Sequence, residues 1–487
     1  MDKKIILTFL LIILAGQVLP GRAVSSQALD QWSPVRRIPN YNLTDRAPYM
    51  VADQNRTVHA FNNGNISSVL GAIYYRRWSP EQGWTPPVDI FVQPLESGLQ
   101  TIQGIFLDQS GVLHLTYANI LDTGGEIYYT QALASIADRA TSWSTPVEIA
   151  ADAGPLAFGT LTGDGKGKLL ALFGAEGNGT GLYESHSMDG GNTWSNPRIL
   201  SILYPRNQWP AAIRSDFDHE GNLHVVWGIV NELGVGDEVR YARLDANFET
   251  WSNETVLSRR EGNDYSSTWP SIIFKDGTLI VIYQDSFPAT RWMRLSTDGG
   301  LTWSLAARPF EYIGEYEHAV LLKDGSGNVH MVLGNRTGNP ATHGMWYTRW
   351  MGRNWTPLVA ITSGPNTSTY DPSAPQAVMV QGNIILATWW HNVRRESLSG
   401  AWYSYISLNI PELPRVTLST PTITSASLTA EPTGAKATQR PISSTPLFAT
   451  KEETPGNPGL PVFFSLIPVV ILIPVIIILN KRRPPKR

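Results

Sequence analysis

A tryptophan motif that returns seven times is the feature that most constrains how this chain of 487 residues can fold. Each copy has Trp followed by Ser or Thr, often with Pro shortly afterwards, and it usually ends in Ile or Leu. The copies lie about 50 to 60 residues apart, which is the period expected for the blades of a β-propeller. Their tryptophans are Trp32, Trp84, Trp143, Trp194, Trp251, Trp303 and Trp355.

The sequence between successive tryptophans predicts three further short strands in each repeat. An apolar strand, a Gly-containing turn and a second strand recur near Asp108, Asp218, Asp276 and Asp324, and a third strand follows. With the strand at the Trp motif, each repeat has four strands. The composition agrees, because Trp, Tyr and Gly are abundant and only 16% of the residues are charged. We therefore predict an all-β propeller of four-stranded blades.

The two ends of the repeat region complete each other. The first Trp motif has no strands before it, and the last three strands, at about residues 373–408, have no Trp motif after them. We expect the strand at Trp32 to be the outermost strand of the last blade, because this pairing would remove an open sheet edge. The prediction is a seven-bladed ring over residues 29–410.

Two of the Trp motifs carry a longer pattern. Residues 187–194 and 296–303 resemble the Asp-box, Ser-x-Asp-x-Gly-x-Thr-Trp, of the sialidase (BNR-repeat) superfamily. The resemblance implies a propeller of the sialidase type, so six blades are the alternative to seven. In such a turn Asp caps the backbone, Gly tolerates a positive φ and Trp packs underneath, so we expect a structural role. The residues concerned are Ser187, Asp189, Gly191, Thr193, Trp194, Ser296, Asp298, Gly300, Thr302 and Trp303.

Four histidines occupy the same place in the second strand of four blades. The other three blades have aliphatic residues there, which indicates packing, and ligands in separate blades would be too far apart for bonds of about 2 Å to one metal. We expect no metal site and no cofactor. The chain has no cysteine, so it has no disulfide. The histidines are His59, His114, His224 and His330, and the aliphatic residues are Leu170, Ile280 and Ile385.

The segments outside the repeats predict a cell-surface location. Residues 1–28 have the basic, apolar and small-residue parts of a secretory signal peptide. Residues 411–460 are rich in Pro, Ser and Thr and predict a disordered stalk. The apolar residues 461–479 predict a transmembrane helix, and the basic residues 480–487 predict a cytoplasmic tail. A net charge of −3, with no basic stripe, argues against nucleic acid as a partner.

One face of the predicted ring collects the loops that could bind a ligand. In a propeller, the loops that lead into the first strand of each blade and those that join its second and third strands meet at one mouth. Aromatic rings together with charged groups suit a sugar, which offers C–H on one side and hydroxyls around its rim. The candidate ligand-binding residues are Arg46, Trp209, Tyr265, Trp269 and Asp371.

The resemblance to sialidases implies a catalytic set at the same mouth. Residues 45–51 are similar to the family's Arg-Ile-Pro motif, which places Arg46 where an arginine binds the substrate carboxylate. Arg206 and Arg336 would complete the cluster, with Tyr370 as nucleophile and Glu315 beside it; Tyr265 and Glu317 are the alternatives for these two roles.

The predicted acid loop does not fit a sialidase. Asn62 and Asn63 stand where a proton donor is expected, and Asn cannot act as a general acid. The sequence therefore favours a non-catalytic module that binds an extracellular glycan or protein, or acts in adhesion. An exo-acting sialidase or related glycoside hydrolase is the alternative, and a protein-binding scaffold is a third possibility.

The predicted topology can be tested with protease on intact cells. A folded fragment that ends within residues 411–461 should be released, because a disordered Pro/Ser/Thr-rich segment is cleavable whereas packed blades resist. Immunoblotting of the medium measures the release. Protection of the propeller until the membrane is broken would contradict the predicted orientation.

Overall fold

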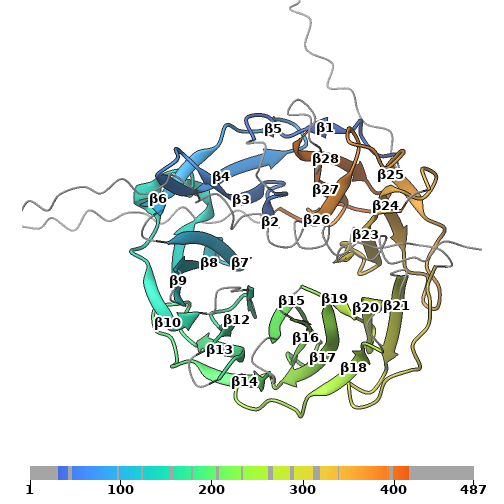
Figure 1. The fold of residues 1–487 in the computed structure, drawn as a ribbon. Helices are drawn as coiled ribbons and strands as arrows, with labels where there is room; N and C mark the ends of the chain where they lie inside the picture. Colours follow the sequence, from blue (N-terminus) through green and yellow to red (C-terminus); the bar gives the residue numbers. More distant parts are fainter. Residues whose placement is uncertain are drawn as a thin grey trace, which may run out of the picture. The chain divides into compact units, whose positions relative to one another are not determined.

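The computed structural model shows a seven-bladed all-β propeller (Figure 1). The structure describes residues 31–41, 46–95, 98–121, 124–153, 158–176, 179–203, 208–231, 234–261, 267–285, 290–310, 319–337, 339–391, 393 and 399–415. The predicted signal peptide, transmembrane helix and tail, and nearly all of the predicted stalk, lie outside these ranges. Within them, no helix has the length and apolar character needed to span a membrane.

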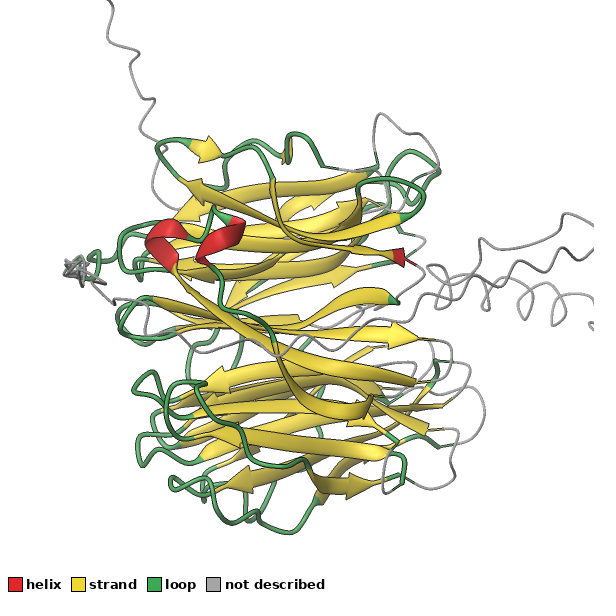
Figure 2. Ribbon diagram, turned by 90° about the vertical axis from the view of Figure 1, so that its left-hand side faces the viewer, coloured by secondary structure: helices red, strands yellow, loops and turns green. Residues whose placement is uncertain are grey.

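Each blade is an antiparallel sheet, and its first strand lies on the inside of the ring (Figure 1). Figure 2 gives the side view, in which the strands run between two opposite faces. Two short 3-10 helices, η2 (Ala134–Ile136) and η3 (Ala140–Ser142), lie in blade 2. The strands are, for blade 1, β2 (Tyr49–Ala52), β3 (Val58–Asn65), β4 (Leu70–Ser79), β5 (Gly83–Trp84) and β6 (Val88–Pro94); for blade 2, β7 (Leu99–Leu107), β8 (Val112–Leu121), β9 (Gly124–Leu133) and β10 (Val147–Ala153); for blade 3, β11 (Gly159–Gly163), β12 (Leu169–Ala175), β13 (Gly181–Ser187) and β14 (Arg198–Ile202); for blade 4, β15 (Gln208–Phe217), β16 (Leu223–Asn231), β17 (Gly236–Leu244) and β18 (Thr255–Arg259); for blade 5, β19 (Thr268–Lys275), β20 (Thr278–Asp285) and β21 (Thr290–Ser296); for blade 6, β22 (Ala319–Lys323), β23 (Val329–Asn335), β24 (Gly344–Arg349) and β25 (Val359–Ser363); and for blade 7, β26 (Pro372–Val380), β27 (Ile384–His391), β28 (Gly400–Ser407) and β1 (Arg36–Arg37).

The N-terminal strand closes the ring, as the sequence predicts. β1 pairs with β28 as the outermost strand of blade 7, with Arg36 opposite Tyr403. The backbone pairing extends beyond β1, because Ser33 N donates to Tyr405 O at 2.7 Å and Ile38 N donates to Ala401 O at 2.8 Å. Residues from the two ends of the domain thus form one sheet, and the count is seven blades, not six.

The prediction placed a fourth strand at each Trp motif, and most fourth strands do begin within the motif. Trp194 lies just before β14, which starts at Arg198 of the same motif, and Trp84 lies in the short strand β5. In blade 5 the fourth strand is reduced, within the described residues, to one isolated bridge between Met293 and Ala307. Pro309 follows two residues later and has no amide hydrogen with which to extend the ladder.

The core lies between the faces of neighbouring blades. Every residue of β12 and of β23 is buried. This pattern differs from the alternation of a half-exposed strand, because a central strand of a blade is covered on both faces. Leu172 of blade 3, for example, shares a cluster with Trp227 of blade 4, which is completely buried.

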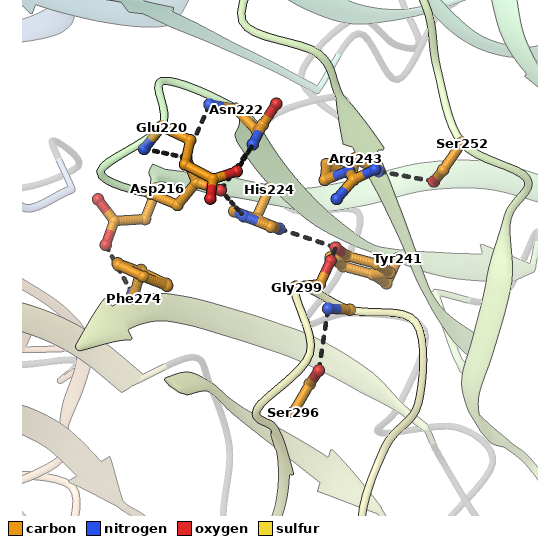
Figure 3. Close-up of polar contacts among 12 residues, drawn as sticks. Asp216, Glu220, Asn222, His224, Tyr241, Arg243, Ser252, Phe274, Ser296 and Gly299 are labelled. Atoms are coloured by element: carbon orange, nitrogen blue, oxygen red, sulfur yellow. Dashed lines mark hydrogen bonds and ion pairs between the residues drawn. The ribbon is translucent and has the colours of Figure 1, made fainter. Parts of the chain in front are cut away.

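The four histidines form a repeated hydrogen-bonded relay. In blade 4, His224 Nδ1 lies 2.7 Å from the Tyr241 hydroxyl, and its Nε2 lies 3.2 Å from Asp218 Oδ2. The Tyr241 hydroxyl also lies 3.2 Å from the carbonyl oxygen of Gly299, in the turn of the next blade (Figure 3). The relay therefore joins one blade to its neighbour.

The other three histidines have the same partners. Each histidine lies 2.7 Å from a tyrosine hydroxyl and within 3.5 Å of an aspartate. All four histidines are 2% exposed or less, which confirms their predicted packing role. Their tyrosine and aspartate partners were not predicted from the sequence. The three sets are Asp53, His59 and Tyr75; Asp108, His114 and Tyr129; and Asp324, His330 and Tyr347.

Histidine and tyrosine occur together or not at all. The tyrosine lies on the third strand of the blade, two residues before the residue that pairs with the histidine of the second strand. In the three blades that lack the histidine, this third-strand position holds a residue other than tyrosine. A buried hydroxyl without its partner would be costly, which explains why the two residues are replaced together. The alternative pairs are Leu170 with Glu184, Ile280 with Met293, and Ile385 with Ser404.

The turn at residues 187–194 has the structural role that the sequence predicts. Gly191 N donates to Ser187 Oγ at 2.8 Å, and Thr193 N donates to Asp189 Oδ1 at 2.9 Å. Gly191 has φ 89°, and a Cβ there would lie 1.9 Å from the Tyr129 hydroxyl of the preceding blade. The glycine is therefore required by a neighbouring blade as well as by its own turn.

The turn at residues 296–303 repeats this arrangement. Gly300 N donates to Ser296 Oγ, and Thr302 N donates to Asp298 Oδ1, both at 2.9 Å. The hydrogen bonds from Thr302 lower the pKa of Asp298 to about 2. Trp194 and Trp303 pack on the tyrosines of the preceding blades, each with ring centroids 4.9 Å apart.

The C-terminal end of the described domain forms a strap across the face that is opposite the mouth. Leu413 N donates to Gln381 O at 2.9 Å, and Glu412 pairs with Arg56 of blade 1 at 2.9 Å. The Leu413 side chain lies against Gly325 of blade 6. The strap therefore contacts three blades and lines a cavity of about 530 Å³.

Deletion of residues 31–40 should destabilise the domain far more than ordinary terminal trimming, because it removes β1 and exposes the edge of β28. Thermal unfolding of the purified domain measures the effect. A melting temperature unchanged by the deletion would be inconsistent with closure by β1.

Replacement of the blade 4 relay by the residues of blade 5 tests the coupling between histidine and tyrosine. His224→Leu alone should lower the free energy of unfolding by about 1 to 3 kcal/mol, because it leaves the partners of His224 unsatisfied. His224→Leu with Tyr241→Met should cost less than the sum of the two single changes. Urea unfolding measures all three, and additive effects would show that the two residues act independently.

The same relay predicts a loss of stability in acid. Burial lowers the pKa of His224, and the hydrogen bonds of Asp218 hold the pKa of that carboxyl below its usual value. The folded domain therefore binds fewer protons than the unfolded chain, and its stability falls as the pH decreases below about 6.5. His224→Leu should reduce this dependence between about pH 6.5 and pH 5.

Candidate ligand-binding mouth

The described part of the mouth contains six of the nine residues predicted for ligand binding or catalysis. Arg206, Tyr265 and Glu315 lie outside the described residues. Trp209 lies in β15 and Trp269 in β19, on the first strands of two neighbouring blades. The other four are Arg46, Arg336, Tyr370 and Asp371, and the structure places the last three together.

Bulges recur in the first strands near the mouth. The register shifts between Ala211 and Arg214, between Thr268 and Ser271, and at the equivalent place in β26. Trp269 has φ 52°, which is strained for a bulky side chain, and such strain is concentrated at functional sites. A bulge also changes the direction in which the following side chains point.

Two arginines from different blades exert their charge on the hydroxyl of one tyrosine, Tyr49. Arg46 precedes β2 in blade 1, and Arg214 lies after the bulge in β15 of blade 4. Burial raises the pKa of the Tyr49 hydroxyl, and the charges of Arg214 and Arg46 oppose that shift. The whole Tyr49 side chain keeps 38% of its surface exposed, so the residue is accessible from solvent.

Neither arginine forms an ion pair with a carboxylate among the described residues. The Arg214 guanidinium donates to Ile213 O at 2.8 Å, and burial lowers its pKa. A guanidinium shielded from water is best stabilised by an anion. An acidic ligand could therefore neutralise the charge of the Arg214 guanidinium.

A second polar group joins blades 6 and 7. Arg336, after β23, forms an ion pair with Asp371, just before β26. His343 Nδ1 accepts from Thr337 N at 3.3 Å, and its Nε2 lies 3.9 Å from Asp371 Oδ1. Burial raises the pKa of the Asp371 carboxyl, an effect that the Arg336 charge only partly offsets.

Tyr370 stands against two imidazoles. Its ring centroid lies 5.6 Å from that of His343 and 5.5 Å from that of His391, and its hydroxyl lies 3.0 Å from Thr362 Oγ1. His391 stacks on Trp402 at 5.1 Å. No hydrogen-bond partner for either His391 ring nitrogen occurs among the described residues.

These groups have defined charge states near neutral pH. Burial, together with the proximity of His343, lowers the pKa of His391 to about 4. Burial also lowers the pKa of His343 and raises that of the Tyr370 hydroxyl. Both imidazoles are therefore uncharged, and Tyr370 keeps its proton.

The loop predicted to lack a general acid has a structural use. Asn63 Oδ1 accepts from Ile102 N of blade 2 at 3.2 Å, and Asn62 is buried. The Asn63 amide therefore joins blade 1 to blade 2, and neither asparagine side chain is a proton donor of acidic strength.

The sequence missed three residues of the mouth, namely Tyr49, Arg214 and His343. Tyr49 stands three residues after Arg46, in the segment that the resemblance had singled out. Arg214 could not be found by alternation, because the bulge before it shifts the inward-facing positions by one residue. His343 follows a loop whose course no local pattern indicates.

Comparison with known proteins identifies the fold class. The sequence matches no protein family and no curated protein. The solved structure of the polysaccharide lyase Uly1 has a TM-score of 0.50 and 12% identity, over 76% of this chain and 91% of that one. This likeness is one of fold.

Two further solved structures are similar at lower scores. A protein of unknown function from Dyadobacter fermentans has a TM-score of 0.47 and 14% identity, over 77% of this chain and 99% of that one. The NanB sialidase from Streptococcus pneumoniae has a TM-score of 0.42 and 12% identity, over 79% of this chain and 70% of that one.

Proposed function

We propose that this chain binds an acidic carbohydrate at the mouth of its propeller. The observation that carries the proposal is the pair Arg46 and Arg214, whose charges both lower the pKa of the Tyr49 hydroxyl and which form no ion pair with a carboxylate among the described residues. A carboxylate or sulfate could accept charge-assisted hydrogen bonds from both guanidinium groups.

Aromatic residues on the first strands at the mouth support a sugar as the carrier of the acid group. Tyr49 and Trp269 lie on first strands at the mouth, where an aromatic face can pack against the C–H side of a sugar ring. The polysaccharide lyase that shares this fold is named for a carbohydrate substrate. Trp209, Arg336 and Asp371 would extend the surface around the acid group.

The proposal includes display outside the cell, on the predicted stalk and transmembrane helix of residues 411–479. Its partner would then be a soluble or surface-bound extracellular glycan. Sialoside hydrolysis receives less support than binding, because Asn62 and Asn63 occupy the predicted acid loop and asparagine cannot act as a general acid.

Arginine substitutions test the proposed site. Arg46→Ala and Arg214→Ala should each weaken binding of uronate or sialoside oligosaccharides by about 2 to 5 kcal/mol, because a charge-assisted pair is lost. Arg46→Lys should also bind weakly, since one ammonium cannot reproduce the planar guanidinium. Calorimetry on the purified domain measures affinity.

Arg77→Ala is the matched control, because Arg77 pairs with Asp138 at the end of β4 that faces away from the mouth. Its binding should equal that of the unaltered domain. Equal affinity for neutral and acidic forms of one oligosaccharide would contradict the proposal, and so would full binding by Arg214→Ala in a folded domain.

A further inference from the structure

The strap at residues 409–415 is attached to blade 7 through one buried residue. Leu413 N donates to Gln381 O at 2.9 Å, and the Gln381 side-chain amide donates back to Leu413 O. Gln381 lies in the turn between β26 and β27 and is 4% exposed. A single residue of blade 7 therefore satisfies both backbone polar groups of Leu413.

Two glycines of neighbouring blades make room for the Leu413 side chain. A Cβ on Gly382 of blade 7 would lie 2.7 Å from Leu413 Cγ, and a Cβ on Gly325 of blade 6 would lie 3.0 Å from the same atom. Gly325 N donates to Gly382 O at 2.7 Å, so the backbones of the two blades are bonded where the leucine packs. Leu413 thus covers the contact between blades 6 and 7.

A charged pair extends the strap to blade 1. Glu412 Oε2 lies 2.9 Å from Nη1 of Arg56, which belongs to the turn between β2 and β3. Arg56 Nε also lies 3.1 Å from Glu81 Oε1, and this second pair holds the guanidinium within blade 1. Blades 7 and 1 are the neighbours that must join to close the ring (Figure 1). The strap therefore spans the closing junction.

The strap and β1 act on this junction at different places. β1 pairs with β28 at the outer edge of blade 7, and the chain then continues into blade 1. The strap instead contacts turns that join first and second strands, and the first strands lie on the inside of the ring (Figure 1). The ring thus has an inner attachment in addition to its outer one.

The strap is held by few contacts and borders a hollow. The cavity of about 530 Å³ is lined by Ala52 of blade 1 and Met379 of blade 7, together with Leu413 and Pro414 of the strap. Leu413 keeps 45% of its surface exposed, and an ion pair that is partly exposed, such as Glu412 with Arg56, contributes little to stability in water. The strap can therefore detach without disturbing the cores between the blades.

We propose that the strap is a releasable lock on the junction of blades 6, 7 and 1, and that tension on the chain beyond residue 415 opens it. Most of the predicted stalk follows the strap, so a pull between the membrane and a ligand bound to the ring would load the strap first. After its release, the junction depends on β1 and on the packing between the blades. The lock does not depend on which ligand the mouth binds.

Hydrogen exchange on the full chain tests the lock. Leu413→Ser removes the packed side chain, and Gln381→Asn shortens the amide that reaches Leu413 O, while asparagine still tolerates the φ of 48° at this position. Each variant should exchange about 5-fold faster or more in β1 and in the turn at residues 53–57, because the junction opens more often. Exchange should stay within about 2-fold in blades 3 and 4, on the other side of the ring (Figure 1).

Leu305→Ser is the matched control, because Leu305 of blade 5 is 89% exposed. It should leave exchange unchanged throughout the ring. Unchanged exchange at the junction in both strap variants would overturn the lock. An equal increase in all seven blades would overturn it too, because it would indicate a general loss of stability instead of local opening.

Optical tweezers test the release by tension. The chain has no cysteine, so Met188→Cys, at a position of blade 3 that is 52% exposed, provides one handle on the ring, and the C-terminus provides the other. Load between these handles passes through the strap. In this background, Leu413→Ser should lower the force of the first opening step, and Leu305→Ser should not. Faster exchange at the junction with an unchanged opening force would overturn the coupling to tension, and neither result bears on binding at the mouth.

Discussion

The contact between a tyrosine of one blade and a turn of the next holds much of this ring together. Tyr129 and Tyr241 each accept the ring of a neighbouring tryptophan and approach a glycine that could not carry a side chain. Each of these tyrosine hydroxyls also contacts a histidine of its own blade, and each histidine lies beside an aspartate, so the polar contacts continue into the blade. A turn that seems local in sequence is thus shaped by the blade before it, which is why glycine is needed there for two independent reasons.

The repeat pattern predicted the fold well because it reports burial, and burial dominates the stability of a propeller. The number of Trp motifs predicted the number of blades. The incomplete repeats at the two ends of the domain predicted that β1 closes the ring. The fourth strands begin within the motifs, except in blade 5, where the described residues form only one bridge and Pro309 cannot extend the ladder. The histidines were correctly judged structural, but their polar partners come from residues 6 to 17 positions away and left no periodic signal.

The mouth was predicted less completely, for physical reasons. Arg336, Tyr370 and Asp371 were chosen by residue type and loop position, and they meet. Arg214 was not predicted because a bulge precedes it in β15. Tyr49 was not predicted because it lies on a first strand, where side chains are usually assigned to the core. The group at Tyr370 differs from the sialidase pattern in having imidazoles beside the tyrosine. Fold likeness alone would not have distinguished these chemistries, because one scaffold can carry many different sites.

Closure by β1 also has a consequence for the order in which the domain can form. The strand made first on the ribosome pairs with β28, among the last to be made, so it must wait unpaired while nearly the whole domain is synthesised. Contacts between consecutive blades can form earlier, since they join segments close in the chain. The joining of blade 7 carries the greatest loop-closure entropy and is the natural last step. Until then the hydrogen-bonding edge of β28 stays open, and the nascent chain is most exposed to wrong pairing at that seam.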